Sequence, residues 1–236
     1  MTEQQRMEVS VDPVTVWWAE RTASTLALTA VLDPTERARR ERYLRAADAE
    51  RFTLGVALTR FALGDLLGVA PERVEIDRSC SDCDKPHGRP RVAGRPDAPQ
   101  VSVSHSGDRI GVAVSSHGPL GLDVEESRKV SDDIARHVLA TGETAATTAE
   151  LLVYWTRKEA LLKATGEGLR VPMPHLRTSH AHEEPRLLAW NGRDDHPGRF
   201  VLHELAPGPG YSAHLALLDH PGGVPVQQRP STELLP

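Results

Sequence analysis

One segment of the sequence combines the alternation of a β-strand with a pair of carboxylates. Residues 121–125 read GLDVE, so on a strand the apolar side chains point one way and Asp123 and Glu125 point the other. Two carboxylates on one strand face can converge on a single point. The same pattern also fits an ordinary edge strand whose polar residues face solvent. The pair is therefore a candidate cation site that needs a third ligand from elsewhere in the chain.

A second segment places charges close to the apolar side of a predicted helix. Residues 155–163 read WTRKEALLK, and Glu159 and Lys163 lie one above the other on a helix. A plain ion pair worth about 0.2–0.5 kcal/mol is one interpretation. The flanking Trp155 and leucines favour another, because a charge in apolar surroundings is unfavourable unless something binds it. With the strand pair, these groups predict a site for Mg²⁺ and a phosphate.

Upstream of both segments, Ser104-His105-Ser106 ends another alternating stretch that begins at Gln100. Two hydroxyl residues beside a histidine, followed by a glycine turn at Gly107, indicate a patch that contacts phosphate. A histidine at the surface or at the edge of the core is the alternative interpretation.

Antiparallel strands and helices must position these groups. The sequence predicts strands at 14–19, 74–76, 100–105, 110–114 and 120–125, helices at 34–47, 48–68, 131–140 and 143–166, and a hairpin of 199–205 with 211–218. Each half of the chain thus has helices followed by antiparallel strands, which predicts an α+β fold of two similar lobes. We assign residues 1–118 to an N-terminal lobe and 119–220 to a C-terminal lobe. Residues 221–236, rich in Pro, Gly and Gln, are expected to be disordered.

Composition excludes several classes of protein. The net charge of −5 argues against bulk nucleic-acid binding, although residues 36–51 carry six arginines. That stretch is either a solvated helix face or a surface for phosphate or an acidic partner. No window approaches twenty consecutive apolar residues, so no membrane span is expected. The polar start of the chain lacks the apolar stretch of a signal peptide, which predicts a cytoplasmic protein.

The two cysteines, Cys80 and Cys83, form a single C-x-x-C motif. A zinc site would need two more ligands, and only His87 lies nearby in the sequence. We expect these cysteines to have no more than a minor structural role.

Three segments together resemble a known family. SVSHSG, PLGLDVEES and WTRKEALLKATGEGL are similar to the signature segments of the Sfp-type 4′-phosphopantetheinyl transferases, in the family's order and at about its spacing. The Arg-rich stretch ERARRERYLRAADAERF and the HGRP segment at residues 87–90 extend the similarity. It covers about residues 15–218.

The resemblance implies a pseudo-twofold fold with its active site between the lobes. It implies an enzyme that transfers the 4′-phosphopantetheine arm of coenzyme A to a serine of an apo acyl or peptidyl carrier protein, releasing adenosine 3′,5′-bisphosphate. Asp123, Glu125 and Glu159 would hold Mg²⁺, for which Mn²⁺ can substitute. Glu159 would also be the general base, and Lys163 would steady and protonate the departing phosphate. Contacts to coenzyme A would come from Arg39, Arg51, Arg89, Ser104, His105 and Lys158.

The resemblance also implies a monomer that serves carrier proteins of polyketide or nonribosomal peptide assembly lines, and fatty-acid synthase carriers fit the same chemistry. Nucleic acid and membrane are not expected partners. Two other classes stay open on the residues alone. One is a metal-dependent phosphohydrolase that acts on a nucleotide or diphosphate, and the other is a non-catalytic module that docks on carrier proteins.

Overall fold

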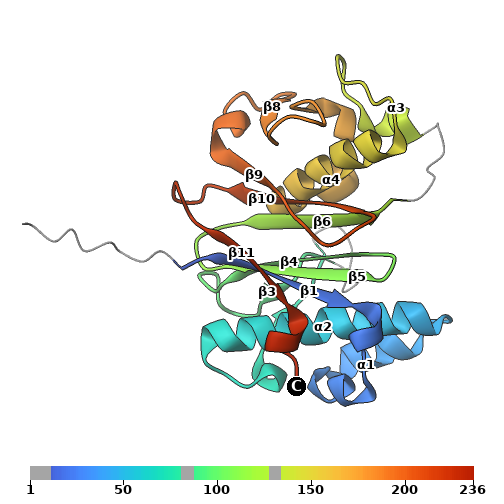
Figure 1. The fold of residues 1–236 in the computed structure, drawn as a ribbon. Coiled ribbons are helices and arrows are strands. Elements are labelled where there is room, and N and C mark those ends of the chain that lie inside the picture. Colours follow the sequence, from blue (N-terminus) through green and yellow to red (C-terminus); the bar gives the residue numbers. More distant parts are fainter. Residues whose placement is uncertain (1–11, 81–87, 128–133) are drawn as a thin grey trace, which may run out of the picture.

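Two β-sheets packed face to face form the centre of the molecule, and a long helix covers the outer face of each sheet (Figure 1). The structure is a computed structural model that describes residues 12–80, 88–127 and 134–236. The order of the layers is helix α2 (Ala46–Leu67), a four-stranded sheet, a three-stranded sheet and helix α4 (Thr148–Thr165). The predicted α+β fold with two lobes of antiparallel sheet and helix is confirmed.

The N-terminal lobe contains the four-stranded sheet, in the order β11-β1-β5-β4. Its elements are β1 (Val14–Glu20), α1 (Pro34–Glu41), α2, β2 (Ile76–Asp77), β3 (Arg91–Val92), β4 (Gln100–Ser106), β5 (Arg109–Ser115) and β11 (Val226–Pro230). The predicted strands at 100–105 and 110–114 are β4 and β5, which form a hairpin with its turn at Gly107.

The C-terminal lobe repeats this arrangement in the order β6-β10-β9. Its elements are β6 (Leu120–Glu126), α3 (Ala135–Val138), α4, β7 (Leu176–Thr178), β8 (Leu187–Trp190), β9 (Phe200–Glu204) and β10 (Tyr211–Leu218). The pairing of β1 with β5 and of β5 with β4 thus corresponds to the pairing of β6 with β10 and of β10 with β9, and β11 is an additional strand on the outer edge of β1. The predicted hairpin of β9 and β10 is confirmed.

Every second side chain of β1 and β6 points into the core between the two sheets. Val14, Val16 and Trp18 of β1 face Leu122 and Val124 of β6 in one apolar cluster. The opposite face of each strand points to its own helix, α2 or α4. Asp123 and Glu125 therefore lie on the α4 side of β6.

Several helix boundaries differ from the prediction. Helix α4 begins at Thr148 instead of residue 143, and the helix predicted at 131–140 is, within the described residues, only Ala135–Val138. The first Arg-rich helix ends at Glu41 and α2 begins after Arg45, so Asp48 lies within the first turn of α2 instead of capping it. Helix α4 ends where predicted, at Gly166, whose φ of 77° is left-handed. Residues 131–133 of the third predicted helix lie outside the described residues.

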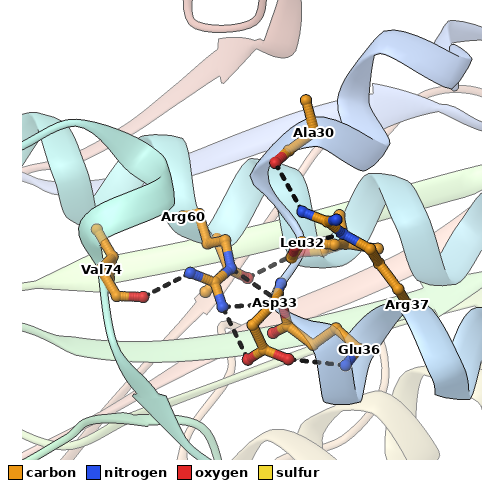
Figure 2. A network of polar contacts seen from close by, with 9 residues as sticks. Ala30, Leu32, Asp33, Glu36, Arg37, Arg60 and Val74 are labelled. Atoms are coloured by element: carbon orange, nitrogen blue, oxygen red, sulfur yellow. Dashed lines mark hydrogen bonds and ion pairs between the residues drawn. The ribbon is translucent and has the colours of Figure 1, made fainter.

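The start of α1 is fastened to α2 by a buried arginine (Figure 2). Asp33 and Glu36 form a capping box at the start of α1. Arg60 of α2 donates to Glu36 Oε2 at 2.8 Å and to the Val74 carbonyl oxygen at 2.6 Å. The capping acids thus also neutralise a buried cation, which fixes the Arg-rich helix against the lobe.

The expectation of a disordered tail was wrong. Residues 226–230 form β11, which pairs in parallel with β1 from Val14↔Val226 to Trp18↔Pro230. Val224 is buried, and the chain end packs onto the core beneath α2. The Pro, Gly and Gln content concealed these few apolar anchors, and an edge strand tolerates proline at its end.

Candidate active site

Strand β6 and helix α4 touch directly because residue 121 is a glycine. A Cβ atom at Gly121 would lie 2.0 Å from the Ala160 carbonyl oxygen and 2.5 Å from the Ala164 backbone nitrogen. No side chain fits in that space. Helix α4 therefore lies close over the strand face that carries Asp123 and Glu125.

Asp123 and Lys163 form the central contact of the site. The Asp123 side chain is 4% exposed, and its Oδ1 accepts from Lys163 Nζ at 2.6 Å and from Ser104 Oγ at 2.9 Å. Lys163 Nζ also donates to Ser104 Oγ and to the Leu122 carbonyl oxygen, both at 3.0 Å. These contacts use all three donors of the ammonium group. The lysine predicted one turn above Glu159 is thus directed at the strand carboxylate.

Glu159 lies within electrostatic reach of both strand carboxylates. Burial disfavours its charged form, and the negative charges of Asp123 and Glu125 add to this effect, so the pKa of Glu159 is raised. The positive charge of Lys163 offsets part of the shift. A carboxylate with a raised pKa is a better proton acceptor than an ordinary one.

The hydroxyls of β4 reach this cluster from the other lobe. Ser104 contacts both Asp123 and Lys163, and Ser106 Oγ donates to Glu125 Oε2 at 2.7 Å. The sequence prediction included Ser104 but gave Ser106 no separate role. The site is therefore assembled from β4, β6 and α4.

His105 lies on the other face of β4 and is exposed. Partial desolvation and the positive charges of Arg51 and Lys163 lower the pKa of His105, so its ring is neutral at pH 7. Arg51 of α2 donates to the Gly107 carbonyl oxygen at 2.6 Å and to Asp48 Oδ1 at 2.7 Å. His105 and Arg51 thus lie together at the end of β4, beside the acidic cluster.

Lys158 does not join the site. Its side chain is 0% exposed, and Nζ donates to the Val138 carbonyl oxygen at 2.6 Å and to Glu143 Oε2. Burial lowers the pKa of Lys158, and the bond to Glu143 partly counters the effect. The expected contact of Lys158 with phosphate is therefore corrected to a structural ion pair inside the C-terminal lobe.

Arg157, which the sequence analysis passed over, is also structural. Its fully buried guanidinium donates to the carbonyl oxygens of Ser179, His180 and Glu183 at 2.8–2.9 Å. It also donates to His214 Nε2 at 3.3 Å, so the proton of the neutral His214 ring lies on Nδ1. Burial lowers the pKa of His214 to about 3. The only sequence signal was a second charge beside Lys158 in an apolar helix.

The other predicted cations lie at the margins. Arg39 stacks over the Phe52 ring, 5.1 Å from its centroid. Arg89 donates to the Ala164 carbonyl oxygen at 3.1 Å and the Leu120 carbonyl oxygen at 3.4 Å, so it joins the end of α4 to the start of β6. Burial lowers the pKa of Arg89. Both assignments to coenzyme A remain predictions.

The cysteine motif is only partly described. Cys80 is half-buried, whereas Cys83 and His87 lie outside the described residues. The expectation of a minor role therefore stays a prediction.

The acidic cluster fits a divalent cation in its donor types. In the part of the chain that the structure describes, no group of three or more His, Cys, Asp or Glu side chains is already arranged as a set of metal ligands. Asp123 Oδ2 is nevertheless buried with no hydrogen-bond partner among the described residues. Such an oxygen is unfavourable unless a cation or donor reaches it. Carboxylate oxygens are the ligands that Mg²⁺ prefers, and a cation would relieve the repulsion that raises the pKa of Glu159.

Comparison with known proteins identifies the same region of the chain. The sequence profile described as "4'-phosphopantetheinyl transferase superfamily" matches residues 119–214, which include β6, α4 and all three acids, Asp123, Glu125 and Glu159. The described helices contain none that is both long and apolar enough to cross a membrane.

Two curated relatives support this match. The 4′-phosphopantetheinyl transferase Sfp of Bacillus subtilis is 27% identical over 186 residues, which are 75% of this chain and 79% of that protein. The 4′-phosphopantetheinyl transferase HetI of a Nostoc species is 31% identical over 154 residues, 60% of this chain and 62% of that protein. The chain thus spans most of the first relative and just under two thirds of the second.

Among solved structures, the holo-[acyl-carrier-protein] synthase of Thermotoga maritima aligns with 44% of this chain and 65% of its own. The TM-score is 0.34 and the sequence identity is 23%, so no residue is assigned from it.

The fold brings two α+β lobes together, with Asp123, Glu125, Glu159 and Lys163 at their junction. Residues 119–214 are similar to the 4′-phosphopantetheinyl transferase superfamily, and longer stretches of the chain are similar to curated 4′-phosphopantetheinyl transferases.

Proposed function

We propose that the protein transfers the 4′-phosphopantetheine arm of coenzyme A to a serine of an apo carrier protein and releases adenosine 3′,5′-bisphosphate. One observation carries this proposal. Asp123, Glu125, Glu159 and Lys163 converge at the junction of β6 and α4, within the segment that matches the superfamily.

The reaction exchanges a phosphoanhydride bond of coenzyme A for a phosphodiester bond to the carrier serine. The serine oxygen of the carrier forms a bond to the phosphorus that bears the pantetheine arm, and the bond from that phosphorus to the departing bisphosphate oxygen breaks. Such transfers need in-line positioning and neutralisation of charge more than covalent help. Glu159, which lies beside Asp123 and Lys163, accepts the serine proton on its carboxylate.

Asp123, Glu125 and Glu159 would hold Mg²⁺, with the unpartnered Oδ2 of Asp123 as one ligand atom. When bound, Mg²⁺ supplies positive charge beside the diphosphate oxygens of coenzyme A.

Lys163 has a specific constraint in this reaction. All three of its N–H donors already bind protein oxygens, those of Asp123, Ser104 and Leu122. To steady the departing phosphate oxygen, Nζ must exchange one of these contacts for the substrate. The 28% exposure of its side chain leaves room for that exchange.

The N-terminal lobe would supply the remaining contacts to coenzyme A. His105 and Arg51 lie beside the cluster, where the neutral imidazole and the guanidinium can both donate to phosphate oxygens. Arg39 and Arg89 are further candidates. Carrier proteins are generally acidic around the modified serine, so the Arg-rich surface of α1 suits such a partner.

The direct test is a transfer assay. The full-length protein is incubated with coenzyme A, Mg²⁺ and several apo carrier proteins from polyketide, nonribosomal peptide and fatty-acid systems. Intact mass spectrometry should show one added phosphopantetheine arm, lost when EDTA replaces Mg²⁺ and regained with Mn²⁺. No mass gain on any carrier would overturn the proposal.

The same assay separates the alternatives. A phosphohydrolase would release phosphate or a nucleotide from coenzyme A without any carrier. A docking module would bind the carrier without changing its mass.

A further inference from the structure

Three serines of β4 join the two sheets through a regular ladder of hydrogen bonds. One edge of β6 pairs with β10, and backbone N–H groups on its other edge donate to serine hydroxyls of β4. The bonds run from Leu122 N to Ser102 Oγ (2.9 Å), from Val124 N to Ser104 Oγ (3.3 Å) and from Glu126 N to Ser106 Oγ (3.1 Å). The constant offset of twenty residues means that β4 and β6 run parallel. We call Ser102, Ser104 and Ser106 the serine ladder.

Each hydroxyl in the ladder has a single proton to donate. Ser104 donates it to Asp123 Oδ1 at 2.9 Å, and Ser106 donates it to Glu125 Oε2 at 2.7 Å. The position that corresponds to these acids for Ser102 is Gly121, which has no side chain. Two of the three serines in the ladder, Ser104 and Ser106, therefore each bind one carboxylate in the same way.

The serines belong to the N-terminal lobe and the acids to the C-terminal lobe. The orientation of Asp123 and Glu125 therefore depends on how the two lobes lie relative to each other. Ser106 is buried, and the bond it accepts from Glu126 fixes its hydroxyl oxygen. Glu125 is only half-buried, and a glutamate side chain has considerable rotamer freedom to lose on ordering. A buried, anchored hydroxyl at 2.7 Å removes much of that freedom before any ligand arrives.

We propose that Ser106 is a positioning residue, whose hydroxyl holds the Glu125 carboxylate in the orientation in which it binds the divalent cation. The inference rests on the proposed function, because it requires that Glu125 be a cation ligand. Groups that orient metal ligands in this way typically change metal affinity or activity about 10–100-fold when they are removed. Ser104 acts on Asp123 in the same manner but also contacts Lys163, so Ser106 gives the cleaner test.

The ladder provides its own control. Ser106→Ala and Ser102→Ala each remove one acceptor for a β6 N–H group, and only Ser106→Ala also removes a hydrogen bond to a carboxylate. The full-length proteins are stripped with EDTA and titrated with Mn²⁺, with free Mn²⁺ measured by electron paramagnetic resonance. Thermal unfolding reports the structural effect, which should be similar in the two variants. Ser106→Ala should weaken Mn²⁺ binding about 10-fold or more, whereas Ser102→Ala should stay within about two-fold of the wild type.

Three results would overturn the inference: unchanged Mn²⁺ affinity in Ser106→Ala, an equal loss in both variants, or no Mn²⁺ binding by the wild type. Transfer of the phosphopantetheine arm is scored separately on the same samples. Absence of transfer together with the expected difference in Mn²⁺ binding would overturn the proposed function and support the role of Ser106. Normal wild-type transfer with no difference in Mn²⁺ binding would do the reverse.

Discussion

Replacing Gly121 with alanine tests whether the close approach of α4 to β6 sets the geometry of the site. The new Cβ would lie 2.0 Å from the Ala160 carbonyl oxygen, and ordinary contact begins at 3.4 Å, so α4 must recede by roughly 1.4 Å. The obstructing oxygen belongs to the helix backbone and cannot rotate away. Overpacking of this kind costs about 1–3 kcal/mol of unfolding free energy. The same shift would stretch the 2.6 Å contact between Lys163 and Asp123 beyond hydrogen-bonding distance.

Two measurements follow from that estimate. Urea unfolding should give a free energy of unfolding lower by about 1–3 kcal/mol. The transfer assay should show a rate lower by about 100-fold, because a misplacement of about 1 Å at a reacting centre has effects of that size. Gly198→Ala is the matched control, since a Cβ at Gly198 has no heavy atom within 4 Å. Its stability should stay within about 0.5 kcal/mol of the wild type.

A Gly121→Ala variant with the stability and the rate of Gly198→Ala would show that the close approach of α4 to β6 does not set the geometry of the site. Reduced stability with a normal rate would be more specific. It would show that β6 and α4 are tightly packed but that their spacing does not control the chemistry.

Four further predictions follow from the charged groups and the tail. Glu159→Gln should lose nearly all transfer by intact mass, since it removes the proton acceptor. In EDTA the variant should be more stable than the wild type at pH 8, because the raised pKa of Glu159 means that its ionisation opposes folding. The difference in unfolding free energy between the variant and the wild type should develop as the pH rises above the ordinary glutamate pKa. It should vanish well below that pKa, where Glu159 is protonated in both the folded and the unfolded chain. A stability difference independent of pH would contradict the assignment of a raised pKa to Glu159. Lys163→Ala should lower the rate more than the affinity for coenzyme A, and the opposite pattern in steady-state kinetics would restrict the lysine to binding. Lys158→Met should lower the free energy of unfolding by about 3–5 kcal/mol, because the Glu143 carboxylate is left buried without the Lys158 ammonium group. Adding Glu143→Gln to this variant should restore part of the lost stability. Titration calorimetry should show that the folded Lys158→Met variant binds coenzyme A with unchanged affinity. A clear loss of affinity would show that Lys158 takes part in coenzyme A binding. Deleting residues 223–236 should lower the free energy of unfolding in urea by about 3 kcal/mol or more, because β1 loses its partner strand and the core loses the apolar side chains of the tail. An unchanged urea midpoint would show that β11 contributes little to stability.

Local pattern was sufficient for the strands of the two central sheets other than β11, and for the carboxylates of β6 and the charges of α4, but it did not predict β3, β7 or β8. The alternation in residues 120–126 predicts which side chains face the core, and packing between the sheets enforces the same choice. The four-residue spacing of Glu159 and Lys163 places them on one side of α4, and Gly121 marks where the helix comes closest. These are properties of single elements, so the sequence can carry them.

Contacts between distant segments were not predictable in this way. Neighbouring residues on a helix differ by about 100° in direction, so Lys158 and Glu159 face different surroundings. Because α4 is buried on several sides, its periodicity does not show which charge faces β6. The partner of Lys158 is Glu143, fifteen residues away, and nothing local pairs them. The hydrogen bond from Ser106 to Glu125 was not predicted for the same reason, because the partners of Ser106 lie nineteen and twenty residues further on in β6.

The repeated topology explains why the site occurs at one junction and not at its counterpart. Strands β1 and β6 each have seven residues and occupy equivalent places in the two sheets. Counted from the first residue of each strand, Trp17 takes the place of Asp123, and it packs in the apolar core with α2. The outer edge of β1 is closed by backbone pairing with β11, whereas the outer edge of β6 meets the serine ladder.

That difference has a chemical consequence. A backbone partner uses the edge N–H groups and leaves no hydroxyl to orient a carboxylate. The serine ladder satisfies the same N–H groups and still has one O–H per residue to donate. The acids therefore lie where the two sheets are joined by side chains, and there the serines bind the β6 N–H groups and the carboxylates of Asp123 and Glu125 at once.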